Sequence, residues 1–429
     1  MYIRRVVLEN VRGFSELDFS FQRSNKDALE EYAGWDVVTG DNASGKTAFL
    51  KAVALALIGP DATRTLQPSL EGWIRQGKRS ATIAVQLVAG EKDKFAQGRP
   101  YHQPFWSELE LRCDDNGNIT MSEGRKYLRK GKGPTRGPWT EHPDGWFCAG
   151  YGPFRRLYGH SPEAQRLMST RGKIARFATL FREDATLQES DLWLKELRYR
   201  DLEGDESSRM TLMFVLSVLN SEFLQNGMTV ERVDSDGLWL QDRRGIILSL
   251  RDLSDGLRSA IAMLTDILRQ LIDVYGIRDQ QIRAAGDVVL DYPGVVLIDE
   301  VDSHLHPEWQ RQIGFWFKKL FPSIQFVVTT HSPLICQAAS DRSIWHLPAQ
   351  DSEQAPFKLS EVDYRSVIAG KPDTILLTPA FGLTNTRSPK AVEARREYAQ
   401  LRSKGRAIPL TQDEAKRQME LELYVTGDE

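Results

Sequence analysis

Gly40-Asp41-Asn42-Ala43-Ser44-Gly45-Lys46-Thr47 is the stretch that decides the fold, because it has the spacing G-x-x-x-x-G-K-T. It stands between the apolar run Trp35–Thr39 and the apolar-periodic run Ala48–Ile58, which predict a strand and a helix. A loop in this setting directs backbone N–H groups and a helix N-terminus at one point, which suits a triphosphate. We expect Asn42 and Gly45 to surround the phosphates, Lys46 to reach the β- and γ-phosphates, and Thr47 to hold Mg²⁺.

Composition sets outer limits on the kind of protein. The 429 residues, 41% of them hydrophobic, are enough for two or three globular domains. Lys and Arg number 56 against 59 Asp and Glu, so any nucleic-acid surface must be a local patch. The three cysteines are widely spaced and predict neither a disulfide framework nor a zinc site. With no leader-like or bilayer-length apolar run, we expect a soluble, cytoplasmic protein without a membrane partner.

The N-terminal part alternates like a sheet. Tyr2–Val11 and Leu17–Phe21 read as strands joined by the turn Arg12-Gly13-Phe14, and Ala81–Val88 and Trp106–Arg112 read as two more. These strands predict an antiparallel sheet appended to the nucleotide-binding core.

Two basic segments follow. Gly124–Gly137 contains six basic residues and no acidic one: Arg125, Lys126, Arg129, Lys130, Lys132 and Arg136. It is either a loop that contacts a phosphate backbone or a solvated connection. After the turn Gly150-Tyr151-Gly152-Pro153, Arg155 and Arg156 are aimed either at a phosphate or a partner's acidic surface, or are paired structurally with carboxylates.

A helical insert and a second lobe follow. Apolar residues at helical spacing run from Glu163 to about Leu224, and Val230–Val233, Leu238–Leu240 and Ile246–Leu248 read as short strands. Ser254 and Gly256 then open the helix Ala260–Val274. Such a helix N-terminus suits an anion, although by itself it is an ordinary helix cap.

Two buried strands each end at polar residues. Gly294–Ile298 delivers Asp299 and Glu300, and Gln325–Thr329 is followed by His331. At the carboxyl end of a parallel strand, a carboxylate can hold Mg²⁺ and its neighbour can activate water. His331 is either a sensor of the γ-phosphate or a structural histidine.

Together these motifs resemble the ABC-type ATPase heads of the SMC, double-strand-break-repair and RecF group, and more closely the OLD-like ATPases. The matching segments, in family order, are GDNASGKT, LSDGLRS, VVLIDEVDSHLHP and TTHSP. The resemblance implies an ATP-sandwich dimer, in which Ser254 and Gly256 of one copy close on the γ-phosphate held by the other. Glu300 would be the catalytic carboxylate, Asp299 the magnesium-associated one, Asp302 an interface contact and His331 the switch.

The resemblance has departures. Asp255 stands where transporter-type heads have Gly, and the lid glutamine is not evident, with Gln76 and Gln86 as candidates. His304 and His306 suggest a metal site, but the resemblance makes them a family loop near the dimer interface.

The layout resembles stand-alone ATPases of bacterial anti-phage systems, such as PtuA of Septu or retron systems and AriA of PARIS. We expect an N-terminal lobe (residues 1–160), a helical insert (161–228), a C-terminal lobe (229–345) and an α-rich docking tail (346–429). This tail lacks the carboxylate cluster of a Toprim domain and an H-N-H pattern. The expected protein is a Mg²⁺-dependent ATPase that oligomerises and controls a separately encoded effector nuclease, with DNA or a phage protein as a further partner. The alternative is a RecF- or SMC-like repair ATPase that clamps DNA in its ATP-bound dimer.

Overall fold

A six-stranded sheet forms the centre of the computed structural model, which describes residues 1–23, 31–96, 98–101, 103–128, 132–159, 161–170, 172–224, 227–276, 281–282, 288–349, 352, 354–422 and 424–425. Its strand order is β16-β15-β3-β14-β13-β7. The strands are β3 Gly34–Gly40, β7 Cys148–Tyr151, β13 Gly294–Ile298, β14 Ile324–Thr329, β15 Ile344–Leu347 and β16 Phe357–Lys358. All pairs are parallel except β15 with β16. Strand β3 precedes the phosphate loop, β14 precedes His331 and β13 precedes Asp299. These three strands lie side by side in one sheet, in the order β3-β14-β13.

A second, antiparallel sheet has the order β2-β1-β4-β5-β6. It consists of β1 Tyr2–Val11, β2 Phe14–Ser20, β4 Ser80–Val88, β5 Phe105–Cys113 and β6 Ile119–Glu123. Helix α1, Lys46–Ile58, contacts strands of both sheets, and every residue in it except Thr47 and Lys51 is buried. A helix that is apolar on all sides needs such a fully enclosed position. The predicted α/β fold, with a P-loop core and an appended antiparallel sheet, is confirmed.

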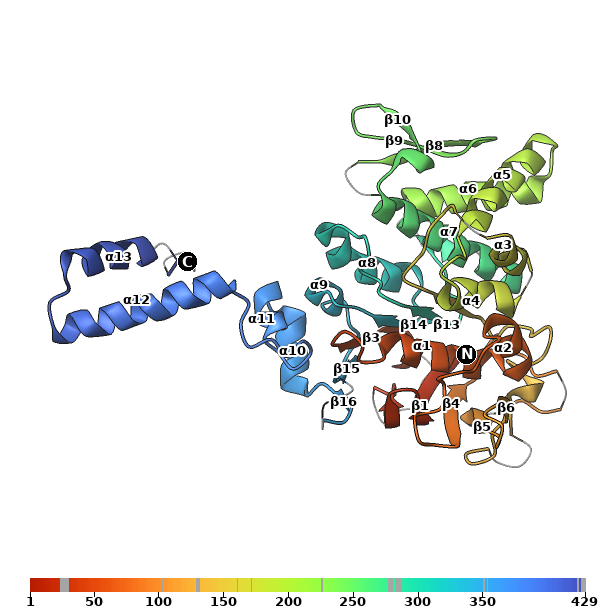
Figure 1. The fold of residues 1–429 in the computed structure, drawn as a ribbon. Helices are drawn as coiled ribbons and strands as arrows, with labels where there is room; N and C mark the ends of the chain where they lie inside the picture. Colours follow the sequence, from red (N-terminus) through yellow and green to blue (C-terminus); the bar gives the residue numbers. More distant parts are fainter. Residues whose placement is uncertain are drawn as a thin grey trace.

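A group of helices packs beside the core (Figure 1). They are α2 Pro60–Leu66, α3 Pro162–Met168, α4 Lys173–Phe181, α5 Gln188–Leu202, α6 Glu206–Asn220 and α7 Asp255–Tyr275. Of these, α4 is in contact with the edge strand β7. A small sheet of β8 Thr229–Asp234, β9 Gly237–Gln241 and β10 Ile247–Ser249 packs on α5. Short 3-10 turns lie at Pro134–Arg136 and Leu250–Asp252, and a two-strand ladder joins β11 Gln281–Ile282 to β12 Val288–Val289.

The C-terminal part divides into a piece that belongs to the core and an arm. It contains α8 Pro307–Leu320, α9 Pro333–Cys336, α10 Glu361–Ala369, α11 Pro372–Leu376, α12 Pro389–Ala407 and α13 Gln412–Glu422. Strand β16 extends the core sheet, and α10 and α11 contact α9. Helices α12 and α13 instead pack on each other and project from the body (Figure 1), with Ala394 and Leu421 as their buried residues. Within the described ranges, no helix combines the length and apolar character needed to cross a bilayer.

Candidate functional site

The phosphate loop has the backbone that its glycines predict. Gly45 has φ +96°, and a Cβ there would lie 2.7 Å from the ring of Phe14, so a side chain is excluded on both grounds. Lys46 is 6% exposed and donates hydrogen bonds of 2.8 Å to the carbonyls of Gly40 and Asp41. Burial lowers the pKa of Lys46, and the neighbouring carboxylates of Asp299 and Glu300 counteract this effect. The ammonium group is thus held by the loop that it would leave to reach a phosphate.

A hydrogen bond joins two segments that are 252 residues apart. The hydroxyl of Thr47 donates to Oδ2 of Asp299 at 2.7 Å. Asp299 is fully buried, and its Oδ1 accepts from the hydroxyl of Thr329 at 2.5 Å. A hydroxyl and a carboxylate at hydrogen-bonding distance are the hard oxygen ligands that Mg²⁺ takes beside a bound triphosphate. The residues present therefore fit the predicted metal.

Glu300 is held on several sides. Its backbone has φ +44°, an uncommon conformation for a residue with a side chain. Its N–H donates to the hydroxyl of Thr329 at 2.7 Å, and its Oε2 accepts from Ser303 at 3.0 Å. Thr329 thus contacts both Asp299 and Glu300. Sequence reasoning treated Thr329 only as the end of a strand, although its place before the Thr-His pair was a usable signal.

Arg155 holds the turn formed by Asp299 and Glu300 through hydrogen bonds to its backbone. Its Nη1 donates to the carbonyls of Gly152 at 2.9 Å and Asp299 at 2.6 Å, and its Nη2 donates to the carbonyl of Glu300 at 3.0 Å. Burial lowers its pKa to about 10, so the guanidinium stays charged at neutral pH. This placement corrects the prediction that Arg155 faces a phosphate or a partner. It also differs from carboxylate pairing, because the acceptors are backbone carbonyls. Arg156 instead lies over the ring of Phe154.

The loop after β14 carries the predicted switch. His331 is exposed and lines the same cavity as Lys46 and Glu300. Oδ1 of Asp302 accepts from the hydroxyl of Thr330 at 2.5 Å and from the N–H of His331 at 3.3 Å. In this chain the predicted interface carboxylate therefore also orders the histidine loop.

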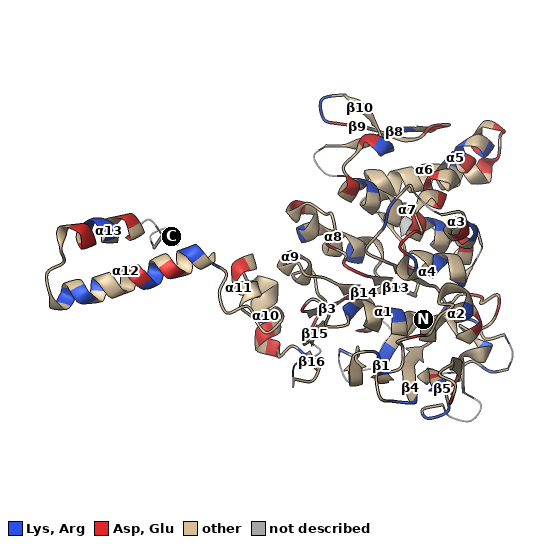
Figure 2. Cartoon of the chain, viewed as in Figure 1, with Lys and Arg blue, Asp and Glu red and all other residues tan. Residues whose placement is uncertain are grey.

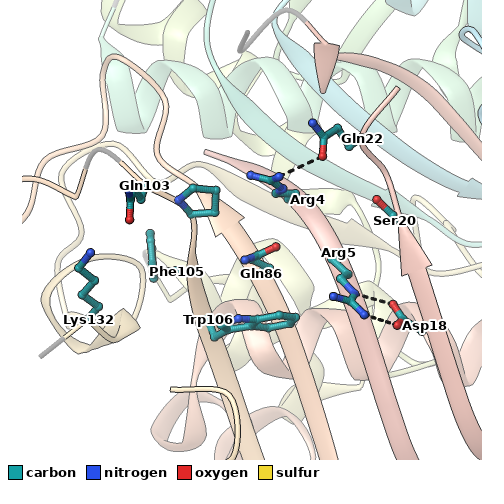
Figure 3. A pocket seen from close by; sticks show the side chains of 11 residues that line it. Arg4, Arg5, Asp18, Ser20, Gln22, Gln86, Gln103, Phe105, Trp106 and Lys132 are labelled. Atoms are coloured by element: carbon teal, nitrogen blue, oxygen red, sulfur yellow. Dashed lines mark hydrogen bonds and ion pairs between the residues drawn. The ribbon is translucent and has the colours of Figure 1, made fainter. Parts of the chain in front are cut away.

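This cavity has a volume of about 1060 Å³. Besides Lys46, Glu300 and His331, its lining residues are Arg12, Gly13, Asn42, Ala43, Gly45, Thr47, Ala48, Gly72, Ile74, Arg75, Gln76 and Gly77. Sequence reasoning missed Arg12, treated as a turn residue, and Arg75. The cavity therefore has two cationic side chains, Arg12 and Arg75, in addition to Lys46. Gln76 lines the cavity, whereas the other lid candidate, Gln86, lies on the outer face of the antiparallel sheet (Figure 3).

The helix-opening Ser254 and Gly256 lie in a different cavity, of about 590 Å³, together with His304 and His306. A Cβ on Gly256 would lie 2.0 Å from the carbonyl oxygen of His304, so glycine is required for this close approach. Nδ1 of His306 accepts from the N–H of Glu308 at 3.3 Å and caps α8. Neither Ser254 nor Gly256 lines the cavity of Lys46 in the same chain.

The predicted basic loop is only partly available for contacts. Lys126 pairs with Glu9 at 2.6 Å, and Arg136 lies over the ring of Tyr101 and donates to the carbonyl of Arg99. Arg125 is exposed, whereas Arg129 and Lys130 lie outside the described residues.

Lys132 lines a groove of about 740 Å³ on the outer face of the antiparallel sheet. Figure 3 shows Lys132 across this groove from Arg4 and Arg5, with Trp106 lying along the sheet between them; Arg5 is paired with Asp18. Figure 2 shows both acidic and basic residues on α12 and α13. The predicted basic loop therefore contributes Lys132 to a groove that also contains Asp18, and contact of this loop with a phosphate backbone stays a prediction.

Comparison with known proteins identifies relatives. Residues 151–337 match the family described as "AAA domain, putative AbiEii toxin, Type IV TA system". The chain is 33% identical over 168 residues to "Retron Ec83 probable ATPase" of Escherichia coli, covering 35% of this chain and 30% of that protein. It is 25% identical over 365 residues to "Septu protein PtuA" of Bacillus mycoides, covering 82% of this chain and 41% of that protein.

The aligned regions thus span less than half of these relatives' length. A solved Smc head domain from Pyrococcus furiosus, bound to the C-terminal domain of ScpA, is 13% identical. It has a TM-score of 0.48, with coverage of 86% of this chain and 98% of that chain. The chain is related to the Septu PtuA and retron ATPases, as the motifs indicated.

Proposed function

We propose that the chain binds ATP with Mg²⁺ and hydrolyses it at a site completed by a second copy, and that this cycle serves an anti-phage defence system. The observation that carries the proposal is the hydrogen bond between Thr47 and Asp299. It joins the phosphate loop to the acidic turn in the arrangement that phosphoryl transfer requires.

Each residue at the site has a role in this mechanism. Lys46 would exchange its two loop carbonyls for the β- and γ-phosphates, and Arg12 and Arg75 would add positive charge from the cavity wall. Thr47 and Asp299 would hold Mg²⁺, which neutralises phosphate charge when bound. Glu300, fixed through Thr329 and Ser303, would orient and deprotonate the attacking water.

A second copy would complete the site, because Ser254 and Lys46 line different cavities in one chain. Ser254 and Gly256 open toward their own cavity and not toward Lys46 of the same chain. A helix N-terminus with an exposed Ser254 is a suitable donor for the γ-phosphate of a facing copy. His331, exposed at the rim, would report whether that phosphate is present.

The defence role rests on the relatives and on the C-terminal arm. Septu PtuA aligns along 82% of this chain. The arm formed by α12 and α13 exposes Ile408, Met419 and Tyr424 while burying little of itself. We propose that this arm docks a separately encoded effector nuclease, whose activity depends on the nucleotide state of the core.

The test uses the Glu300→Gln protein, because it keeps the fold of the site but loses the base. Its native mass and its co-purification with the product of the neighbouring gene are measured with and without ATP. We expect ATP to produce an assembly of at least two copies that retains a nuclease. The Lys46→Ala protein should not assemble, and Glu206→Gln, an exposed change on α6, should behave as wild type. Rapid ATP turnover by Glu300→Gln would disprove the role given to Glu300.

A repair-type DNA clamp is the second candidate, favoured by the groove that contains Lys132, Arg4 and Trp106. It predicts ATP-dependent, salt-sensitive binding of DNA that weakens in Lys132→Gln. The same preparation decides between the two: a dimer that captures DNA and no protein partner indicates a clamp.

A further inference from the structure

A second cavity lies at the opposite end of α1 from the phosphate loop. Its volume is about 990 Å³, and it is lined by the C-terminal residue of α1, Ile58, and by the N-cap and first residue of α4, Gly172 and Lys173. Lys46 begins α1 and Ile58 ends it. At 1.5 Å per residue, the two ends of this helix, one at each cavity, are about 18 Å apart. The two cavities share no lining residue.

A buried arginine with two unpaired guanidinium nitrogens lines this cavity. Arg176 is 4% exposed, and its Nε and Nη1 have no hydrogen-bond acceptor in the described part of the chain. Its guanidinium lies over the ring of Phe147, which provides little compensation for the lost hydration. A buried charge without hydrogen-bond acceptors is costly, and an anion in the cavity would supply the missing acceptors.

Lys173 adds a second cation. Its ammonium group donates to the carbonyls of Ile58 at 3.2 Å and Pro138 at 3.1 Å, and no carboxylate of the described residues forms an ion pair with it or with Arg176. Burial lowers the pKa of Lys173, and Arg176 contributes to the same shift. The N-terminus of α4 begins at Gly172 without a side-chain cap or an acidic residue in its first turn. These features all favour negative charge at one place.

The rest of the cavity is suited to the remainder of a small molecule. The indole of Trp139 is fixed by a hydrogen bond of 2.8 Å to the carbonyl of Ala56, and Ile174 and Val274 add apolar surface. Carboxylates also line the cavity, but all of them are exposed and therefore screened by solvent, unlike Arg176. They are Asp61, Glu123, Glu141 and Asp273.

We propose that this cavity binds a small phosphorylated molecule, with its phosphate between Arg176, Lys173 and the N-terminus of α4. The site is separate from the proposed ATPase site, and its ligand is either free phosphate or a phosphate monoester such as a nucleotide.

The test is calorimetric titration of the full-length Lys46→Ala protein, in which the first site is impaired, with inorganic phosphate, AMP and adenosine. We expect phosphate or AMP to bind once per chain and adenosine not to bind. Tighter binding of AMP than of phosphate identifies a nucleotide as the ligand class, and equal binding identifies the phosphate group alone. Arg176→Met, added to this protein, should weaken binding by at least about tenfold, as expected for loss of a charge-assisted contact. Arg166→Met, which changes an exposed arginine on α3 that does not line the cavity, should have no effect.

Stability measurements distinguish a ligand site from a structural arginine. If Arg176 serves to bind an anion, the ligand-free Arg176→Met protein should have the same melting temperature as its parent or a higher one. Phosphate or AMP should then no longer raise the melting temperature of this variant. A lower melting temperature without ligand would show that Arg176 stabilises the free fold and would overturn the argument. If Arg176→Met does not fold, Lys173→Met decides: binding of phosphate and AMP that is unchanged in Lys173→Met overturns the proposal. The absence of binding at millimolar phosphate and AMP, or binding that survives both substitutions, also refutes the proposal.

Discussion

Thr329→Val tests whether one hydroxyl positions both acidic residues of the site. Valine keeps the shape of threonine but removes the donor to Asp299 and the acceptor for the N–H of Glu300. Both partners are buried or partly buried, and each unsatisfied group costs about 1–3 kcal/mol. The free energy of unfolding should therefore fall by about 2–6 kcal/mol. Because a displacement of about 1 Å can cost about 100-fold in rate, we expect kcat for ATP hydrolysis to fall by about that factor.

The assay combines denaturant unfolding with phosphate release at saturating ATP, well below the melting temperature. Thr211→Val is the matched control, since it removes a buried hydroxyl that donates to the carbonyl of Ser207 at 2.8 Å in α6, far along the chain from the site. This control should lose about 1 kcal/mol and keep its rate. A Thr329→Val protein that loses stability but retains kcat within about twofold would refute the positioning role.

Further predictions concern Lys46, Arg155 and the arm. Lys46→Ala should abolish binding of ATP, measured by calorimetry, because Arg12 and Arg75 lie on the wall and not in the loop. Burial lowers the pKa of Lys46 in the free chain and bound phosphates would raise it, so binding takes up a proton at pH values between the two pKa values. The affinity for a non-hydrolysable ATP analogue should thus be constant below the lowered pKa and fall as pH rises through it. Arg155→Met should lower kcat more than it raises KM, since it frees carbonyls under the acidic turn. Deleting residues 384–429 should leave the melting temperature of the core unchanged and abolish nuclease co-purification.

Much of the site could be predicted from local sequence. The spacing from Gly40 to Thr47 predicts a phosphate loop wherever a strand precedes it and a helix follows. Continuous apolar runs predict buried parallel strands, and the carboxyl ends of such strands lie at one edge of the sheet. Local patterns therefore group Asp299, Glu300 and His331 with Lys46, and the fold brings Lys46, Glu300 and His331 to one cavity.

Contacts between distant segments were beyond that reasoning. Arg155 follows a turn whose pattern is equally compatible with an outward arginine, and only the packing of β7 beside β13 places it under Asp299 and Glu300. The choice between Gln76 and Gln86 also depends on the fold, because Gln76 lies in a turn at the cavity of Lys46, whereas Gln86 lies in β4 and lines the groove on the outer face of the sheet.

The sequence by itself determined the order of the motifs and predicted the strands and the helix around the phosphate loop, together with the residues expected to contact phosphate, because these depend on local spacing and hydrophobic period. The tertiary structure alone decided that Thr329 joins two carboxylate-bearing residues, that Ser254 lies away from Lys46, and that Arg176 is buried with two unpaired guanidinium nitrogens in the described chain. The physical reason is that burial and pairing of a polar group depend on which distant segments surround it, and no local pattern encodes those neighbours.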